Sequence, residues 1–271
     1  MKKIKDNIYV ETGFLGCNPS FVVTSNGIVM IDTPQKPSEA FRWRKEIQTF
    51  GDIAYIINTD HHADHAIGNY YFDADIIMHE NTAKKLDAGR FRDWVRLIEP
   101  QAEPVTEHYF VKKPMFTFSE KMSLRIGEDI FELMHVRSHT EDETLIYMPG
   151  KKVLFAGDTV CANVIPSLRD SYPLEWLEAL QKIEELDVEV VVPGHGEIGD
   201  KGSIRRFRKE LSTLINRVRE RIDQGVSRDE IIRELRYEDV VHSGYPASLS
   251  AYFDQNMDKN IGRLCDVLKG K

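Results

Sequence analysis

Cysteines and long apolar runs are both scarce in this chain of 271 residues. Its three cysteines, Cys17, Cys161 and Cys265, are odd in number and widely spaced, which argues against a disulfide scaffold and favours unpaired thiols in a reducing compartment. No stretch approaches the ~20 apolar residues of a membrane-spanning helix, and the basic start lacks the apolar run of an export signal. We therefore expect a cytoplasmic protein with no membrane partner.

Cationic charge is also in deficit, because 36 Lys and Arg stand against 44 Asp and Glu, for a formal net charge of -8. Binding to a phosphate backbone relies on concentrated cationic charge. The segment 203–225 is rich in Arg and Lys, but its interleaved Glu residues favour a solvated helix face. The composition therefore favours a small-molecule substrate and argues against a nucleic-acid partner.

The rest of the composition, 41% hydrophobic and 30% charged, is typical of a globular protein. Short β-rich runs between residues 7 and 32 predict an antiparallel meander. Residues 98–118 hold three Pro and four aromatics without clear periodicity, which predicts a long loop or flap. The remaining patterns predict helices at 37–50, 80–97 and 173–186, strands at 54–58, 75–79, 121–136, 144–148, 152–156 and 188–192, and a loop at 158–172.

Strands precede helices in each of two successive halves, and the chain from about residue 203 is almost entirely helical. This order suggests two sheets packed together with helices outside them. We expect one domain over residues 1–271, with the flap at about 98–118 and a C-terminal helical segment.

Histidines and carboxylates gather where predicted strands end. Residues 59–65 (TDHHADH) follow the strand at 54–58, His139 follows a second strand, and Asp158 and His195 follow two more. Imidazole and carboxylate are the usual ligands of borderline divalent ions, and rigid strand ends hold them at fixed distances. The pattern therefore predicts a metal site.

In this order, HHADH, the His of SHT, the Asp of GD and the His of PGHG resemble the metallo-β-lactamase superfamily over nearly the whole chain. The resemblance implies a four-layer αββα sandwich with a dinuclear centre in a cleft at the sheet edge. Carried over residue by residue, it implies one ion on Asp60, His62, His139 and Asp158 and a second on Asp64, His65, His195 and Asp158. Asp32, in IDTP, resembles a buried carboxylate that supports the metal loops, although a turn former is the alternative.

The sequence departs from the superfamily signature at one position, where Asp60 replaces the first His. His61 does not repair the motif, because it would face the opposite side of an extended chain from His62. The added carboxylate leaves the first shell about neutral and shifts preference from zinc toward manganese or iron. We expect two divalent ions, with zinc favoured, and a mononuclear centre on the Asp64 side stays open.

The resemblance implies a metal-dependent hydrolase that cleaves an ester-like bond, such as a lactone, thioester, ester or amide, with metal-activated water. Asp64 would orient the attacking hydroxide and carry a proton to the leaving group. Substrate contacts are expected from four residues of the cleft wall and flap, namely His61, His108, Tyr109 and Phe110. Core packing is the alternative for the aromatic residues of the flap.

Two further questions stay open. An iron-dependent oxidoreductase, related to diiron or sulfur-oxidising members of the superfamily, is the alternative function. The segment 243–257 either caps the cleft or forms a subunit contact, and the second reading would give a homodimer.

Overall fold

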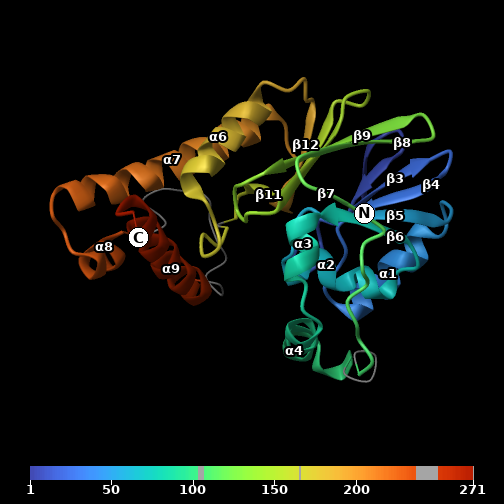
Figure 1. The fold of residues 1–271 in the computed structure, drawn as a ribbon, viewed down its shortest axis with the longest axis horizontal. Helices are drawn as coiled ribbons and strands as arrows, with labels where there is room; N and C mark the ends of the chain where they lie inside the picture. Colours follow the sequence, from blue (N-terminus) through green and yellow to red (C-terminus); the bar gives the residue numbers. More distant parts are fainter. Residues whose placement is uncertain (103–106, 165, 236–249, 271) are drawn as a thin grey trace.

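The computed structural model describes residues 1–102, 107–164, 166–235 and 250–270. Two sheets lie against each other between two sets of helices (Figure 1), which is the predicted αββα sandwich. Within these ranges, none of the helices combines the length and the apolar character needed to cross a bilayer. The segment 243–257, which was expected either to cap the cleft or to form a subunit contact, lies largely outside the described residues. The expectation of a single domain stays a prediction.

The first sheet starts with antiparallel strands and continues with parallel ones. Its strands in the described residues, in spatial order, are β1 (Lys2–Lys5), β2 (Ile8–Val10), β3 (Ser20–Thr24), β4 (Gly27–Ile31), β5 (Ile53–Ile57), β6 (Asp75–His79) and β7 (Phe116–Phe118). The predicted meander is confirmed, because β1 to β4 pair antiparallel, whereas β4 to β7 pair parallel. Parallel strands end at one edge, so the segments that follow β4 and β5 meet there.

The second sheet faces the first and is mostly antiparallel. Its strands in the described residues, in spatial order, are β12 (Val190–Gly196), β11 (Val153–Ala162), β10 (Glu143–Met148), β9 (Asp129–Val136) and β8 (Lys121–Ile126). Among the strands of this sheet in the described residues, only β11 and β12 pair parallel. Their carboxyl ends therefore lie at the same edge, where Asp158 and His195 are found.

Helices accompany both sheets. Those of the first half are α1 (Pro37–Ile47), α2 (Ala63–Ala66), η1 (Ile67–Tyr71), α3 (Glu80–Lys85), α4 (Ala88–Ile98) and η2 (Pro100–Ala102). Those of the second half are α6 (Pro173–Glu184), α7 (Lys201–Asp223), α8 (Arg228–Glu234) and α9 (Ser250–Leu268), all beyond the second sheet in Figure 1.

Alternation of side chains along the strands explains the layers. In β4, Val29 belongs to the core between the sheets, whereas Met30 packs with Trp43 of α1 on the outer face. In β11, Phe155 likewise faces the first sheet and Leu154 faces the outer helices. Successive residues of a strand point to opposite faces, so an unbroken apolar run requires cover on both sides.

Two of the predicted boundaries are wrong because of tertiary pairing. The expected flap ends in strand β7, where Phe116 pairs with Ile77 of β6 and Phe118 enters the inter-sheet core. The expected loop at 158–172 begins later, because β11 continues beside β12 as far as Ala162. Short edge strands and irregular strand ends depend on neighbours that a local pattern does not contain.

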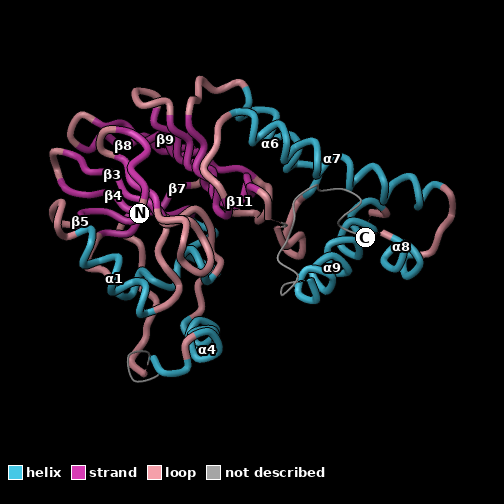
Figure 2. The backbone as a smooth tube through the Cα atoms, turned by 180° about the vertical axis from the view of Figure 1, so that it is seen from behind, coloured by secondary structure: helices cyan, strands magenta, loops and turns pink. Residues whose placement is uncertain are grey.

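The predicted helix at 80–97 is two helices. α3 ends at Lys85, and α4 starts after Asp87, whose side chain accepts a hydrogen bond from the Arg90 backbone N–H. An Asp at this position caps the exposed amides of a new helix. The break directs α4 away from the sheets (Figure 2).

Candidate metal centre

Four side chains from three distant segments form a first cluster. Asp60, His62, His139 and Asp158 each offer a ligand atom, and these atoms lie within 4.8 Å of one another. His62 Nδ1 is 2.8 Å from Asp60 Oδ2 and 3.2 Å from His139 Nε2. His139 Nε2 is 3.4 Å from Asp158 Oδ2. The four atoms therefore surround one small space.

Three further side chains form a second cluster beside it, namely Asp64, His65 and His195. His195 Nε2 is 3.2 Å from Asp64 Oδ2, and His65 Nε2 is 3.8 Å from the same oxygen. The helix α2 begins at Ala63, directly after His62, and turns Asp64 away from the first cluster. One short segment thus supplies both clusters.

Asp158 belongs to both groups through different oxygen atoms. Its Oδ2 faces His139, whereas its Oδ1 lies 3.5 Å from His65 Nε2 and 3.3 Å from His195 Nε2. Ligands bound at ~2.0–2.2 Å to a tetrahedral ion are about 3.3–3.6 Å apart. The distances around Asp158 are therefore in the range expected for ligand atoms of a bound cation.

A glycine makes room for the shared carboxylate. A Cβ on Gly194 would lie 2.0 Å from Asp158 Oδ1, so any larger residue would displace that oxygen. Gly194 precedes His195 in the PGHG segment of β12. The close approach of β11 and β12 therefore depends on this glycine.

Buried polar atoms support the fit of a cation. Asp60 Oδ2, His65 Nε2 and Asp158 Oδ1 are buried and make no hydrogen bond of good geometry among the described residues, although each lies close to another ligand atom. Buried polar groups in proteins are nearly always satisfied, because leaving them unpaired is costly. A divalent ion in each cluster would satisfy these atoms.

Protons balance the carboxylates when no cation is bound. Burial lowers the pKa of His62, but the carboxylates of Asp60, Asp170 and Asp64 together outweigh it and raise this pKa to about 10. Burial would raise the pKa of Asp158, but the neighbouring His195, His65 and His139 lower it well below its usual value. A cation can replace such protons, since metal ligands must be deprotonated.

Asp32 supports the second cluster through His65. Its Oδ2 is 2.9 Å from His65 Nδ1 and accepts a hydrogen bond from the Thr59 hydroxyl, while Oδ1 accepts from the Thr59 backbone N–H. Asp32 also has a φ of 55°, so it forms a left-handed turn after β4. It is both a turn former and the partner that leaves His65 Nε2 directed at the cluster.

The loop between β2 and β3 holds His195, a contact that was not predicted from the sequence. Asn18 donates hydrogen bonds from Nδ2 to the carbonyls of Pro193 and Gly196, on either side of His195. The Gly16 carbonyl oxygen is 2.9 Å from His195 Nδ1. Asn18 stands in no motif that signals this contact, because its partners lie about 175 residues away in the chain.

A family model described as the metallo-beta-lactamase superfamily matches residues 12–195, about two thirds of the chain. This chain belongs to the metallo-β-lactamase superfamily. The predicted resemblance is confirmed, and the superfamily supports a metal-dependent hydrolase as the general class of the protein.

Relatives within the superfamily are distant. The metallo-beta-lactamase type 2 of Elizabethkingia meningoseptica is 26% identical over 220 residues, which cover 76% of this chain and 82% of the relative. The linear primary-alkylsulfatase of Pseudomonas sp. (strain ATCC 19151) is 22% identical over 153 residues, 52% of this chain and only 28% of that relative. A metallo-beta-lactamase structure from Pontibacter korlensis superposes with a TM-score of 0.62 at 21% identity, covering 78% of this chain and 97% of that structure. This last likeness shows the fold alone.

Asp60 and His61 have different neighbours. Asp60 is fully buried and lies in the first cluster, whereas His61 directs Nδ1 to Asp142 Oδ1 at 2.9 Å. Asp142 is held in turn by Thr82 and Lys85. That Asp60 is a metal ligand stays a prediction, and so does a role of His61 in substrate binding.

The three predicted flap contacts occupy different surroundings. Tyr109 is buried in a small core with Phe91, and its hydroxyl donates to the Ile67 carbonyl. Phe110 is exposed and packs on Tyr70, and His108 is exposed. Tyr109 thus has the packing role that was the alternative, and a substrate contact for these residues stays a prediction.

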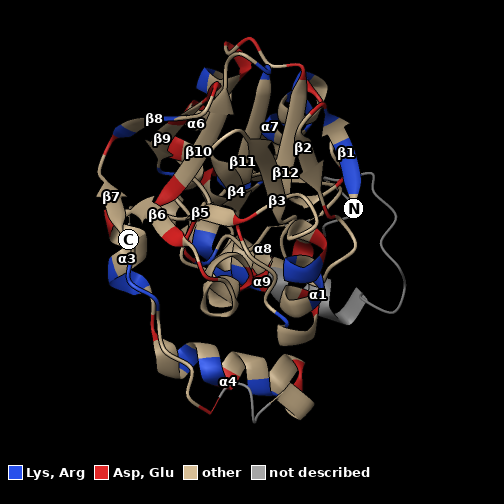
Figure 3. Ribbon diagram, turned by 90° about the vertical axis from the view of Figure 1, so that its right-hand side faces the viewer, with Lys and Arg blue, Asp and Glu red and all other residues tan. Residues whose placement is uncertain are grey.

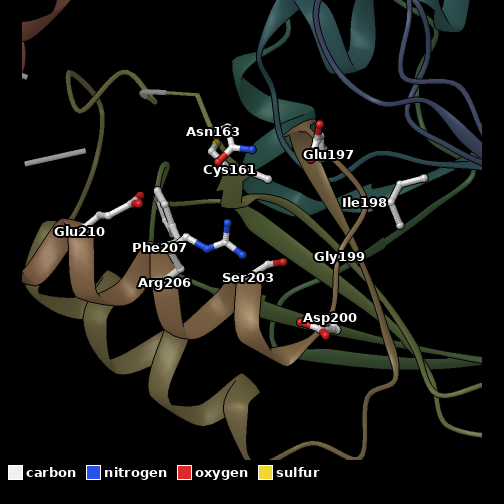
Figure 4. Close-up of a pocket in the computed structure, with 11 residues that line it drawn as sticks. Cys161, Asn163, Glu197, Ile198, Gly199, Asp200, Ser203, Arg206, Phe207 and Glu210 are labelled. Carbon is white, nitrogen blue, oxygen red and sulfur yellow. The ribbon is translucent and has the colours of Figure 1, made fainter. Parts of the chain in front are cut away.

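A pocket of about 260 Å³ lies beside the second cluster, at the ends of β11 and β12. Cys161 and Ala162 line it, and Cys161 is in register with His195 across β11 and β12. Figure 4 shows Arg206 and Ser203 extending from α7 toward these strand ends. The pocket lies beside the cluster and is lined by none of its ligand residues.

Proposed function

We propose that the protein is a metal-dependent hydrolase that uses two divalent ions, preferably zinc, to cleave an ester-like bond in a small molecule. The observation that carries the proposal is the position of Asp158, whose two oxygens face separate groups of ligand atoms. A carboxylate shared in this way is the usual bridge of bimetallic hydrolytic sites. Asp60, His62 and His139 would hold one ion together with Asp158. Asp64, His65 and His195 would hold the other ion, also with Asp158.

Divalent ions supply two effects in such a site, a pKa of water lowered to ~7 and a polarised substrate carbonyl. The protein would provide orientation and proton transfer. Asp64 and His195 have side-chain exposures of 24% and 22%, whereas Asp60 and His65 are fully buried. Substrate would therefore enter beside the second cluster, where the Asp64 carboxylate can orient water and pass a proton to the leaving group.

Apolar side chains near this entry favour a substrate with an apolar acyl or aromatic group. Leu15, 47% exposed, adjoins Gly16, on which a Cβ would lie only 2.8 Å from Asp64 Cβ. Gln35 donates to the Leu15 carbonyl and accepts from the indole N–H of Trp94, which is 38% exposed. An apolar ligand group is favoured by the surface that it removes from water.

Trp94 lies on α4, the helix at one end of the molecule, which carries several Arg residues and Asp93 among uncharged residues (Figure 3). Its link to Gln35 connects this helix to the loop over the second cluster. We infer that α4 and this loop form a substrate-facing wall.

Elemental analysis of the purified protein, combined with a screen of lactones, thioesters, esters, amides, phosphoesters, sulfate esters and β-lactams, tests the proposal. We expect about two zinc equivalents per chain and hydrolysis of one of the carbonyl substrates that is lost after chelation and restored by the metal. Iron content with substrate-dependent oxygen uptake would instead establish the oxidoreductase alternative.

A further inference from the structure

His62 presents its two ring nitrogens to different neighbours. Nδ1 faces the first cluster, 2.8 Å from Asp60 Oδ2 and 3.2 Å from His139 Nε2. Nε2 faces away from these ligands, 3.6 Å from Asp170 Oδ2. An imidazole nitrogen that interacts with a carboxylate fixes the ring and leaves the other nitrogen for a metal. A carboxylate beside Nε2 is therefore placed to help orient the His62 ring.

We propose that Asp170 is a positioning residue for His62, and that the C-terminal helix α9 holds Asp170 in place. The inference rests on the proposed metal centre, because His62 is oriented toward a cation. Asp170 lies in the segment between β11 and α6, and Arg169 donates from Nε and Nη2 to its Oδ2 at 3.1 and 2.9 Å. The oxygen that faces His62 is thus held by a neighbouring guanidinium.

Contacts with α9 fix the segment on both sides of Asp170. The Leu168 backbone N–H donates to Asn260 Oδ1 at 2.7 Å, and Asn260 Nδ2 donates to the Pro166 carbonyl at 2.9 Å. Arg263, one turn further along α9, donates to the Ser171 carbonyl at 3.0 Å. Asn260 is 1% exposed, and both the oxygen and the nitrogen of its buried amide bind the backbone of this segment.

The same segment contacts a second ligand loop. The Tyr172 backbone N–H donates to the Ser138 carbonyl at 2.8 Å, directly before His139. Helix α9 starts at Ser250, beyond the residues 12–195 that match the superfamily model. The chain therefore connects a C-terminal helix outside that match to two residues of the first cluster.

Cation affinity of the full-length, metal-free protein tests this role. Co²⁺ titrations followed by absorption, and Zn²⁺ competition with a chromophoric chelator, report the affinity without any substrate. We expect Asp170→Asn to weaken binding of one cation by about 10- to 100-fold, the effect typical of partners that orient a ligand. The thermal midpoint of the metal-free variant should stay near that of wild type.

Glu175→Gln is the matched control, because Glu175 is an exposed carboxylate nearby on α6 that pairs with Arg137. It should bind cations like wild type. Wild-type affinity in Asp170→Asn would overturn the inference while leaving the metal centre intact. Failure of the wild-type protein itself to bind Co²⁺ or Zn²⁺ would instead refute the proposed function.

A double-mutant cycle tests the part played by α9. Asn260→Ala should weaken cation binding in the wild-type background and have little further effect in Asp170→Asn. Equal losses in the two backgrounds would show that α9 does not act through Asp170. Arg263→Met serves in the same cycle if Asn260→Ala does not fold.

Discussion

Asp32 Oδ2 lies 2.9 Å from His65 Nδ1, and the opposite nitrogen of the same ring faces Asp158 Oδ1 at 3.5 Å. The first contact therefore sets the direction of the second. We predict that Asp32→Asn weakens cation binding by about 10- to 100-fold, because the ring loses its charged partner. Chelator competition measures the loss, and unchanged affinity would refute this role of Asp32.

The shared position of Asp158 predicts an asymmetry between two substitutions. Asp158→Ala removes an oxygen from each cluster, so metal content should fall toward zero and turnover should disappear. His195→Ala removes a ligand from the second cluster alone, so about one equivalent should remain, also without turnover. Elemental analysis distinguishes the two variants, and equal retention of metal in both would contradict a bridging carboxylate.

Asp60→His tests the departure from the superfamily motif. The substitution restores an imidazole at the first position and removes one negative charge from the cluster, so zinc should bind more tightly and manganese less tightly. Competition titrations with both ions report the change in preference. If neither affinity moved, Asp60 would not be a ligand.

Glu143 predicts a pH dependence of stability in the metal-free protein. It is fully buried, and neither carboxylate oxygen has a hydrogen-bond partner among the described residues. Burial raises its pKa well above the ordinary value of 4.5. The folded state favours the protonated group, so the stability present below pH 4.5 is lost as the pH rises above this value.

Glu143→Gln should therefore raise the free energy of unfolding at pH 8 by at least about 1 kcal/mol and have little effect at pH 4. Urea denaturation at both pH values measures it. Glu141→Gln is the control, since Glu141 pairs with Lys85 near the surface and its pKa is lowered by that contact. A gain for Glu143→Gln that is the same at both pH values would exclude ionisation as the cause.

Substitutions of Trp94 test the proposed substrate-facing wall of α4 and the loop over the second cluster. For a substrate found by the screen, Trp94→Ala should raise KM for a long-chain acyl derivative by about tenfold, equivalent to about 1.4 kcal/mol, and leave the acetyl derivative unchanged. Trp94→Phe keeps an apolar ring but loses the hydrogen bond to Gln35. It separates contact with substrate from support of the loop, and a KM that is equally affected for both chain lengths would contradict the proposed contact.

Local residue patterns determined the types of ligand, their order and the layers of the fold. The alternation of apolar residues in β4 and β11 requires cover on two faces, and the motif residues from Asp60 to His65 follow a buried strand. These features depend on neighbours in the chain, so they can be recognised without coordinates.

Only the tertiary structure decided how distant segments meet. Asn18 supports the strand end around His195 from 175 residues earlier in the chain, and Asn260 binds the backbone of Leu168 from 92 residues later. Asp170, in the segment that Asn260 holds, lies beside His62 of a distant loop. No local pattern encodes such contacts, because their geometry arises when strands pair, sheets stack and helices pack across the whole chain.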